Sequence, residues 1–270
     1  MKILAFLLSF SLLLAGCKKD NDKQPEESPE KIFLPQTITI SNHIVPDLNG
    51  TVHLEYNPDR QITRIRTVTK SGSYESVLTY TYDGQKRLIR TNSGEKPVSA
   101  SSYTFQNEYN YEYTSDAPSK LTLISSDNSG ASETLTDNIT RPNPDRFYLW
   151  GTNLSFTPDG DLSSGAGSIY DGWGVSATYG TGTGVFAHVQ KQPAHSFFLN
   201  RHPVTGLLFL AKKELQTLKI NAHENNAFGG DYNAITVQRD AQNRISRYVI
   251  KNDTKTYAHY EIEYLVPQDK

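Results

Sequence analysis

Apolar and polar residues alternate with a period of two in many short stretches of this chain. In residues 80–89 (YTYDGQKRLI), Tyr80 and Tyr82 share one face of a strand, Asp83-Gly84 gives a turn signal, and an apolar pair then resumes the pattern. The stretch therefore predicts a hairpin. We expect Gly84 to adopt a positive φ, so that a β-branched residue would be strained there.

The same kind of unit recurs along most of the chain, and no window shows a sustained helical period. The units start 26 to 43 residues apart, which is too uneven for a solenoid but suits a meander with loops of variable length. We predict an all-β fold, a soluble antiparallel up-and-down meander of roughly 12–14 strands that forms a curved sheet or a barrel-like structure. The predicted strands include residues 37–40, 52–56, 62–69, 77–82, 109–113, 121–124, 154–156, 197–199, 207–210, 235–237, 245–250 and 260–264.

The order of turns in such a meander makes a specific prediction. Alternate connections of an up-and-down sheet lie at the same end, so the turns that contain Asp59, Asp83 and Asp116 should be neighbours. A tyrosine stands shortly before each of these turns. On one face of the sheet these side chains should form a stacked row, made of Tyr56, Tyr82 and Tyr113.

The first residues have the features of a secretory signal peptide. Met1-Lys2 gives a basic start, residues 3–14 form an apolar run, and small residues lead to Cys17. This run of 12 residues is too short to span a bilayer, which needs about 20. Residues 14–17 (LAGC) resemble a bacterial lipobox. We therefore expect Cys17 to be acylated, for example with palmitate, and to become the new N-terminus.

The segment after this cysteine is strongly polar. Residues 18–31 (KKDNDKQPEESPEK) contain nine charged residues and two prolines in fourteen positions. Such a composition cannot bury enough apolar surface to fold, so it predicts a disordered tether. The predicted organisation is a lipoprotein signal peptide at 1–16, the lipidated cysteine and charged tether at 17–35, and a single β-meander domain at 36–270.

Cysteine count and charge exclude several classes of function. Cys17 is the only cysteine, so the chain can form no internal disulfide and no cysteine-based metal site. Without residues 1–16, which carry one lysine and no acid, the chain has 26 basic and 29 acidic side chains, a formal net charge of −3. No basic stripe of the kind found in nucleic-acid binders is present in the sequence, so we expect no nucleic-acid partner.

The recurring hairpin motif also carries a resemblance. Tyr-x-Tyr-Asp followed by Arg-Leu, as in residues 80–88, is similar to the YD repeats of Rhs-type shell proteins. Over about residues 36–266 the chain more closely resembles a Bacteroidetes lipoprotein family of unknown function whose domain is described as porin-like. The resemblance implies a soluble, curved antiparallel sheet and supplies no catalytic residues. From the lipobox and the charged segment after it we expect an outer-membrane lipoprotein that faces the periplasm or the cell surface.

A membrane-spanning barrel is the alternative to a soluble meander, because strands of outer-membrane barrels also alternate. Two features favour the soluble form. The lipobox already provides a membrane anchor, and the polar faces of the predicted strands carry charged residues such as Arg64, Arg66 and Glu112.

The histidines do not predict a metal site. His223-Glu224 begins like the zinc-protease helix motif, but Ala227 stands where the second histidine should be. Three further histidines are spaced seven apart, which suits neither a helical pair nor one face of a strand. They are His188, His195 and His202.

The glycine-rich stretches do not predict a nucleotide site. Residues 180–184 (GTGTG) lack the lysine and hydroxyl residue that end a phosphate-binding loop, and no helix follows them. We expect a flexible hairpin loop there, and a Ser/Gly loop at residues 164–167. No cofactor is predicted.

The strongest candidate for a ligand site is the region from residue 147 to residue 179, where both tryptophans of the chain fall. Aromatic rings beside aspartate and asparagine on loops suit stacking against sugar rings or peptide side chains. The predicted ligand-binding residues are Trp150, Tyr170, Trp173 and Tyr179. The alternative is that Trp150 packs in the core and Trp173 fixes a loop.

Together these features predict a lipid-anchored protein of the bacterial envelope that acts as a binding or scaffold module and not as an enzyme. Its ligand would be a glycan or another extracellular molecule such as a protein, and its membrane contact would be the anchor at Cys17. The alternative is a glycan-directed hydrolase. Two acids distant in sequence could then converge into a carboxylate pair that the sequence alone does not identify.

Overall fold

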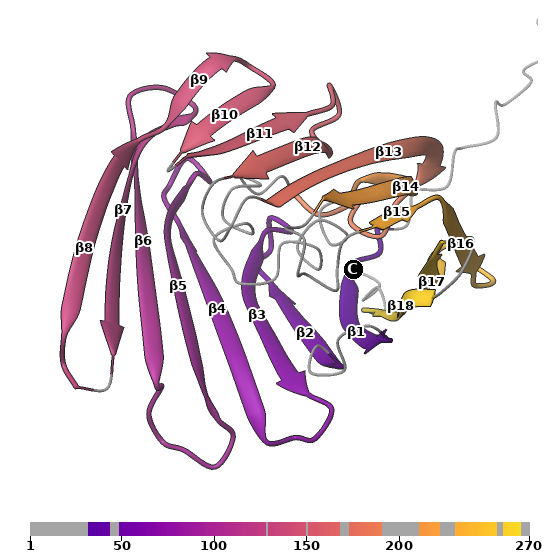
Figure 1. Cartoon of the computed structure of the whole chain (residues 1–270), viewed down its shortest axis with the longest axis horizontal. Helices are drawn as coiled ribbons and strands as arrows, with labels where there is room; N and C mark the ends of the chain where they lie inside the picture. The colour runs from indigo at the N-terminus through magenta and orange to yellow at the C-terminus, as the bar shows by residue number, and fades with distance from the viewer. Residues whose placement is uncertain are drawn as a thin grey trace, which may run out of the picture. The chain divides into compact units, whose positions relative to one another are not determined.

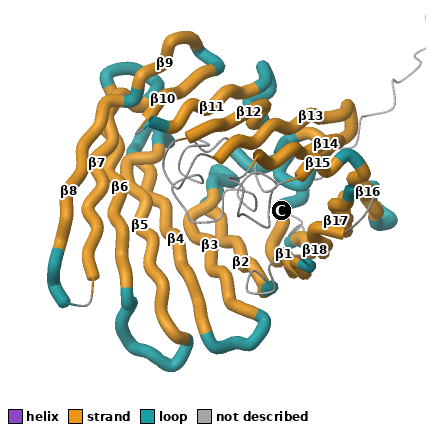
Figure 2. Tube along the Cα trace, in the orientation of Figure 1, coloured by secondary structure: helices purple, strands orange, loops and turns teal. Residues whose placement is uncertain are grey.

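The alternating stretches form strands that pair antiparallel with their neighbours along the chain (Figures 1 and 2). The computed structural model describes residues 32–43, 49–127, 129–149, 151–167, 173–190, 211–221, 230–252 and 256–265, without the side chains of Phe105, Trp173 and Asn221. Residues 33–270 form one compact unit. None of the described segments is a helix of the length and hydropathy that crossing a membrane requires.

The larger of two sheets has eleven strands. In spatial order they are β16 (Ala234–Arg239), β17 (Ile245–Lys251), β18 (Thr256–Tyr264), β1 (Pro35–Asn42), β2 (Gly50–Tyr56), β3 (Ile62–Thr69), β4 (Tyr74–Tyr82), β5 (Leu88–Pro97), β6 (Phe105–Tyr113), β7 (Pro118–Asp127) and β8 (Ser132–Asn138). Strands β1 and β18, from opposite ends of the unit, pair along their lengths, with Ile38 opposite Ile262 and Ile40 opposite Tyr260.

The smaller sheet has seven strands. In spatial order they are β15 (Gly230–Tyr232), β14 (Lys213–Asn221), β13 (Trp173–Thr183), β12 (Leu162–Gly167), β11 (Thr152–Phe156), β10 (Arg146–Leu149) and β9 (Thr140–Asn143). The predicted all-β antiparallel meander is thus confirmed. It is divided into two sheets that are not closed into a barrel, and its described residues contain eighteen strands instead of the expected 12–14.

The repeated turns share one loop geometry, which corrects the expectation for Gly84. The amide of Lys86 donates to the carbonyl of Asp83 at 3.0 Å, and the amide of Asp83 donates to the carbonyl of Arg87 at 3.0 Å. Lys86, with φ of 65°, is the residue in the left-handed region. Gly84 does not have a positive φ, and a Cβ added to it would meet no atom within 4 Å. The predicted strain at position 84 is therefore wrong.

The first residue of the loop caps the turn with its side chain. Oδ1 of Asp83 accepts hydrogen bonds from the amides of Gln85 and Arg87, both at 2.9 Å. Its other oxygen accepts a bond from Nε of Arg87 at 2.8 Å. These bonds, the one from the Arg87 amide above all, lower the pKa of Asp83. The same two backbone bonds close the loops 57–61, 157–161 and 240–244.

The predicted grouping of the turns is confirmed. Nζ of Lys86 lies 2.7 Å from Oδ1 of Asp59, and the guanidinium of Arg87 donates to the carbonyl of Ser115 at 3.4 Å. The three turns are therefore neighbours at one end of the larger sheet, because contacts of this length join each to the next.

The tyrosines before these turns all pack against the core, on one face of the sheet as predicted, and hydrogen bonds link them to neighbouring hairpins. Their stacking on one another stays a prediction. Each hydroxyl donates to the carbonyl of the first residue of a preceding strand. The pairs are Tyr56 to Pro35 at 2.6 Å, Tyr82 to Ile62 at 2.7 Å and Tyr113 to Leu88 at 2.7 Å. Two other strands repeat the arrangement, with Tyr179 bonded to Leu162 at 2.8 Å and Tyr264 to Ile245 at 3.0 Å.

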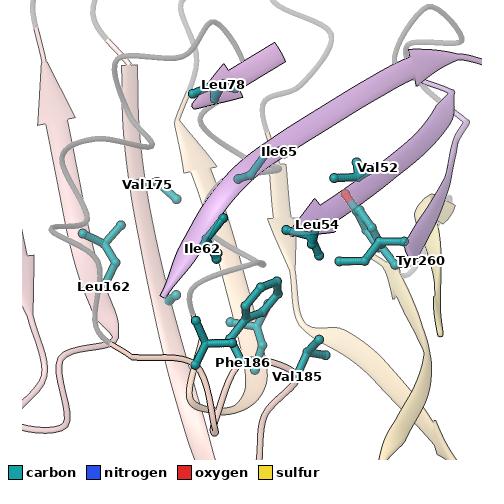
Figure 3. Packing of buried hydrophobic residues seen from close by; sticks show 14 of the residues in the cluster. Val52, Leu54, Ile62, Ile65, Leu78, Leu162, Val175, Val185, Phe186 and Tyr260 are labelled. Carbon is teal, nitrogen blue, oxygen red and sulfur yellow. The ribbon is translucent and has the colours of Figure 1, made fainter. Parts of the chain in front are cut away.

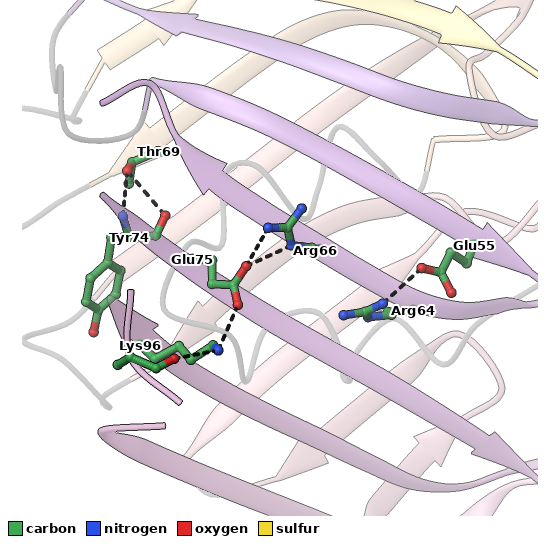
Figure 4. A network of polar contacts seen from close by, with 8 residues as sticks. Glu55, Arg64, Arg66, Thr69, Tyr74, Glu75 and Lys96 are labelled. Atoms are coloured by element: carbon green, nitrogen blue, oxygen red, sulfur yellow. Dashed lines mark hydrogen bonds and ion pairs between the residues drawn. The ribbon is translucent and has the colours of Figure 1, made fainter. Parts of the chain in front are cut away.

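Cross-strand ion pairs cover the face of the larger sheet opposite the core. Glu55 pairs with Arg64 at 3.1 Å, and Arg66 with Glu75 at 2.7 Å. Lys96 approaches the other oxygen of Glu75 at 3.5 Å, so one carboxylate links β3, β4 and β5 (Figure 4). The hydrogen bond from Arg66 is the main reason that the pKa of Glu75 is lowered.

One hydrophobic core joins both sheets. It contains inward-facing residues of β1 to β7, of β10 to β15 and of β17 and β18, together with a short segment that follows β13. In this segment Val185 and Phe186 lie among aliphatic side chains that include Ile62 and Leu54 (Figure 3). The amide of Gln190 then donates to the carbonyl of Arg60 at 3.1 Å. The segment thus connects the core to the turn between β2 and β3.

Candidate functional site

A groove of about 350 Å³ lies where loops of the two sheets meet, and we call it the hairpin-end groove. Its lining comes from the β4–β5 and β6–β7 loops of the larger sheet and from the β9–β10 and β11–β12 hairpins of the smaller one. The lining contains aromatic, basic and acidic residues side by side. These are Tyr82, Tyr113, Phe147 and Phe156, then Lys86, Arg87 and Arg141, then Asp116 and Asp145.

The aromatic side chains of the groove are held in place by the fold. Phe147 and Phe156 meet edge to face, with ring centroids 5.5 Å apart and an angle of 89° between their planes. Tyr113 is fixed by its hydrogen bond to Leu88. Burial is the main cause that raises the pKa of Tyr113 to about 12, so its hydroxyl stays a hydrogen-bond donor at neutral pH.

Two of the three basic residues already have carboxylate partners. Arg87 binds Asp83 of its own loop at 2.8 Å, and its guanidinium lies 4.7 Å from the ring centroid of Tyr113. Lys86 pairs with Asp59 of the adjacent turn. Both cations therefore serve first to hold the turns together, because a carboxylate already pairs with each of them.

Arg141 is placed differently. It lies in β9, at the start of the sequence Arg-Pro-Asn-Pro-Asp, and is exposed. Its NH2 group donates to the carbonyl of Pro144 at 2.8 Å, and its guanidinium stacks 4.5 Å from the ring centroid of Phe147. Within the part of the chain that the structure describes, no carboxylate forms an ion pair with it. Arg141 therefore presents an oriented guanidinium to the groove.

The residues predicted to bind a ligand lie mostly beyond the described residues. Trp150, Tyr170 and the anchor Cys17 lie outside them, and only the backbone of Trp173 is described, at the start of β13. Their predicted roles stay predictions. Tyr179 packs against the core and donates its hydroxyl to Leu162, so the structure gives this residue a role in the fold.

The expected glycine loops are strands. Residues 180–183 belong to β13, and residues 164–167 belong to β12. A Cβ at Gly180 would come within 2.7 Å of the side chain of Gln216, and one at Gly184 would come within 2.5 Å of the carbonyl oxygen of Ala211. These glycines allow the neighbouring strand to approach closely. The prediction of flexible loops here is wrong.

Among the described side chains, no three histidine, cysteine or acidic residues lie close enough together to hold a metal ion. Of the histidines considered above, only His188 is described, and His195, His202 and His223 lie in segments that the description leaves out. The expected lack of a metal or cofactor stays a prediction.

Comparisons with known proteins give weak similarities in structure. No protein-family model and no curated protein matches the chain. A porin-like protein from Bacteroides vulgatus ATCC 8482 is 13% identical, with 87% of this chain and 99% of that chain covered and a TM-score of 0.39. A porin-like protein from Bacteroides uniformis ATCC 8492 is also 13% identical, with coverages of 86% and 98% and a TM-score of 0.32. The structural neighbours are thus porin-like proteins of Bacteroides, whereas the predicted lipoprotein family stays a prediction.

Proposed function

We propose that this protein is a lipid-anchored binding module of the bacterial cell envelope, and that its hairpin-end groove takes a sugar. One observation carries the proposal: aromatic rings, an oriented guanidinium and exposed carboxylates line the same groove. Aromatic faces stack against the apolar faces of sugar rings. A guanidinium group donates hydrogen bonds to sugar hydroxyls, and a carboxylate accepts hydrogen bonds from them. The framework of repeated loops keeps these groups in place before a ligand arrives.

Hydrolysis is the alternative, because two carboxylates, Asp116 and Asp145, border the groove. Both side chains are exposed. A glycosidase instead needs one carboxyl group in an apolar surrounding that keeps it protonated as the general acid. The exposure of both acids therefore favours binding without bond cleavage.

Filling the groove tests its role. Ala117 is part of the lining, so Ala117→Trp should weaken binding of oligosaccharides by about tenfold or more while leaving the unfolding temperature close to that of the unchanged protein. The measurement is calorimetric titration with a panel of neutral and uronic-acid oligosaccharides, followed by mass analysis of the recovered sugar. Ser99→Trp, in an exposed turn at the other end of the strands, is the matched control.

Three results would count against the proposal. The groove is not the site if the Ala117 variant binds as the unchanged protein does. The protein is not a sugar-binding module if no oligosaccharide of the panel binds. Recovery of shortened sugar would favour the hydrolase instead.

The anchor is the second half of the proposal and rests on the sequence before residue 32. The lipobox-like residues 14–17 and the charged segment after them support acylation at Cys17. Stable attachment needs more than one acyl chain, which lipidation of a lipoprotein cysteine supplies. Cys17→Ala should therefore move the protein from the membrane fraction to the aqueous fraction of the cells. Full retention of this variant in the membrane fraction would exclude the anchor.

A further inference from the structure

We propose that the hairpin-end groove is specific for acidic sugars and that Arg141 binds the carboxylate of a single uronic-acid unit. This inference rests on the proposed sugar-binding function and goes beyond it by naming the ligand class and the residue that selects it. Among the described residues, three arginines stack on aromatic rings: Arg87, Arg141 and Arg244.

Two of these arginines belong to the repeated loops and have the same surroundings. Arg87 stacks on Tyr113 and pairs with Asp83, four residues earlier. Arg244 stacks on Tyr264, with a 4.7 Å distance to the ring centroid, and pairs with Asp240, again four residues earlier. In both loops the carboxylate neutralises the guanidinium. The stacked arginine of this loop type is thus part of the turn.

The third, Arg141, has the stacking without the carboxylate. Its guanidinium lies over Phe147 and donates a hydrogen bond of 2.8 Å to the carbonyl of Pro144. In the described part of the molecule no acidic group pairs with it, although Asp145 borders the same groove.

An arginine held in this way is suited to a ligand carboxylate. Stacking fixes the plane of the guanidinium, so less conformational freedom is lost when its parallel N–H groups bind two carboxylate oxygens. The adjacent rings of Phe147 and Phe156 offer apolar surface for the sugar ring that carries this carboxylate. Charge-assisted bonds of this geometry are stronger than those to neutral hydroxyls.

The acids of the groove limit the charge of the ligand. Asp116 and Asp145 are exposed in the same lining, and Lys86 and Arg87 already bind Asp59 and Asp83. A chain of consecutive acidic sugars would bring further negative charges near these carboxylates, which costs free energy. The ligand class that fits is therefore a mainly neutral oligosaccharide with one uronic acid.

The test compares two ligands that differ in one group. The first is a xylo-oligosaccharide that carries one glucuronic acid, and the second is the same compound after reduction of its carboxyl group to a hydroxymethyl group. Calorimetric titration of the unchanged protein should show that the acidic sugar binds about tenfold or more tightly. Arg141→Ala should remove this difference, so that the two sugars bind with affinities within about twofold of each other, while Arg141→Lys should restore part of the difference.

Arg146→Ala is the matched control, because Arg146 is an exposed arginine in the next strand and is not part of the groove lining. It should keep the preference. Equal affinity of the unchanged protein for the two sugars would overturn the inference and leave the sugar-binding function standing, whatever the Arg141 variants do to the fold. Binding of neither sugar, nor of any sugar in the wider panel, would remove the proposed function itself.

Discussion

Replacing Phe186 with alanine is expected to lower the free energy of unfolding by about 3–5 kcal/mol, as loss of a buried aromatic side chain does. Phe186 is 1% exposed and belongs to the core that joins the two sheets. Phe186 lies in the short segment after β13. Val185 and Val189 of the same segment are also buried in this core. A cavity at this point would face strands of both sheets, so neighbouring side chains could fill it only in part. Urea unfolding followed by circular dichroism measures the change.

Tyr148→Ala is the control for this prediction. Tyr148 is also an aromatic residue, but 48% of it is exposed, and its loss should change stability by less than about 1 kcal/mol. If the two variants lost equal stability, the segment after β13 would not be a structural part of the core.

Asp161→Ala should cost about 2–4 kcal/mol, because it leaves the backbone amides of two half-buried residues without an acceptor. Asp161 has an exposed fraction of 0%. Its two carboxylate oxygens accept hydrogen bonds from the amide of Lys212 at 2.7 Å and from the amide of Lys213 at 3.1 Å. The side chain thereby ties the start of β14 to the β11–β12 loop. The same unfolding experiment measures its contribution.

Two further variants distinguish the effect of the hydrogen bonds that Asp161 accepts from the effect of its negative charge. Asp161→Asn keeps one acceptor oxygen and should lose less stability than the alanine variant. Asp159→Ala removes an exposed acid two residues earlier, which pairs with the side chain of Lys213, and should have little effect. An unfolding midpoint of Asp161→Ala equal to that of Asp159→Ala would show that the buried hydrogen bonds do not stabilise the strand.

The sequence predicted those strands whose two faces differ clearly in polarity. Residues 62–69 were expected as one strand and form β3 with the same limits, because Ile62 and Ile65 face the core while Arg64 and Arg66 face outward. The turn chemistry could also be predicted, since aspartates such as Asp83 and Asp240 cap backbone amides at the start of their loops. The positive φ was assigned to the wrong residue because the loop is longer by one residue than a two-residue hairpin turn.

The missed strands lack that contrast between faces. Strand β8 lies at the edge of the larger sheet, and most of its residues are exposed, so nothing requires large apolar side chains there. Strands β12 and β13 both contain glycines, which in a sequence indicate a loop, and Gly180 and Gly182 of β13 permit the close approach of side chains from β14. The pairing of β1 with β18 joins residues more than 200 positions apart, and no local pattern contains that information.

The groove could not be predicted from the sequence, because four separate loops supply its lining. Phe147 fell inside the region that the sequence indicated as a ligand site, since aromatic residues gather there. Arg141 was missed. Its only local signal is its place in the proline-containing turn Arg-Pro-Asn-Pro-Asp, and the missing carboxylate partner becomes visible only by comparison with the loops of Arg87 and Arg244.

Hydrogen exchange tests most directly the central claim that this protein binds a sugar in the hairpin-end groove without cleaving it. The unchanged protein would be incubated with the glucuronic-acid xylo-oligosaccharide, and both the amide exchange and the mass of the recovered sugar would be measured. We predict slower exchange in residues 83–88, 113–118, 141–147 and 156–160, which line the groove, together with intact sugar. Protection confined to other segments, or recovery of a shortened sugar, would contradict the account.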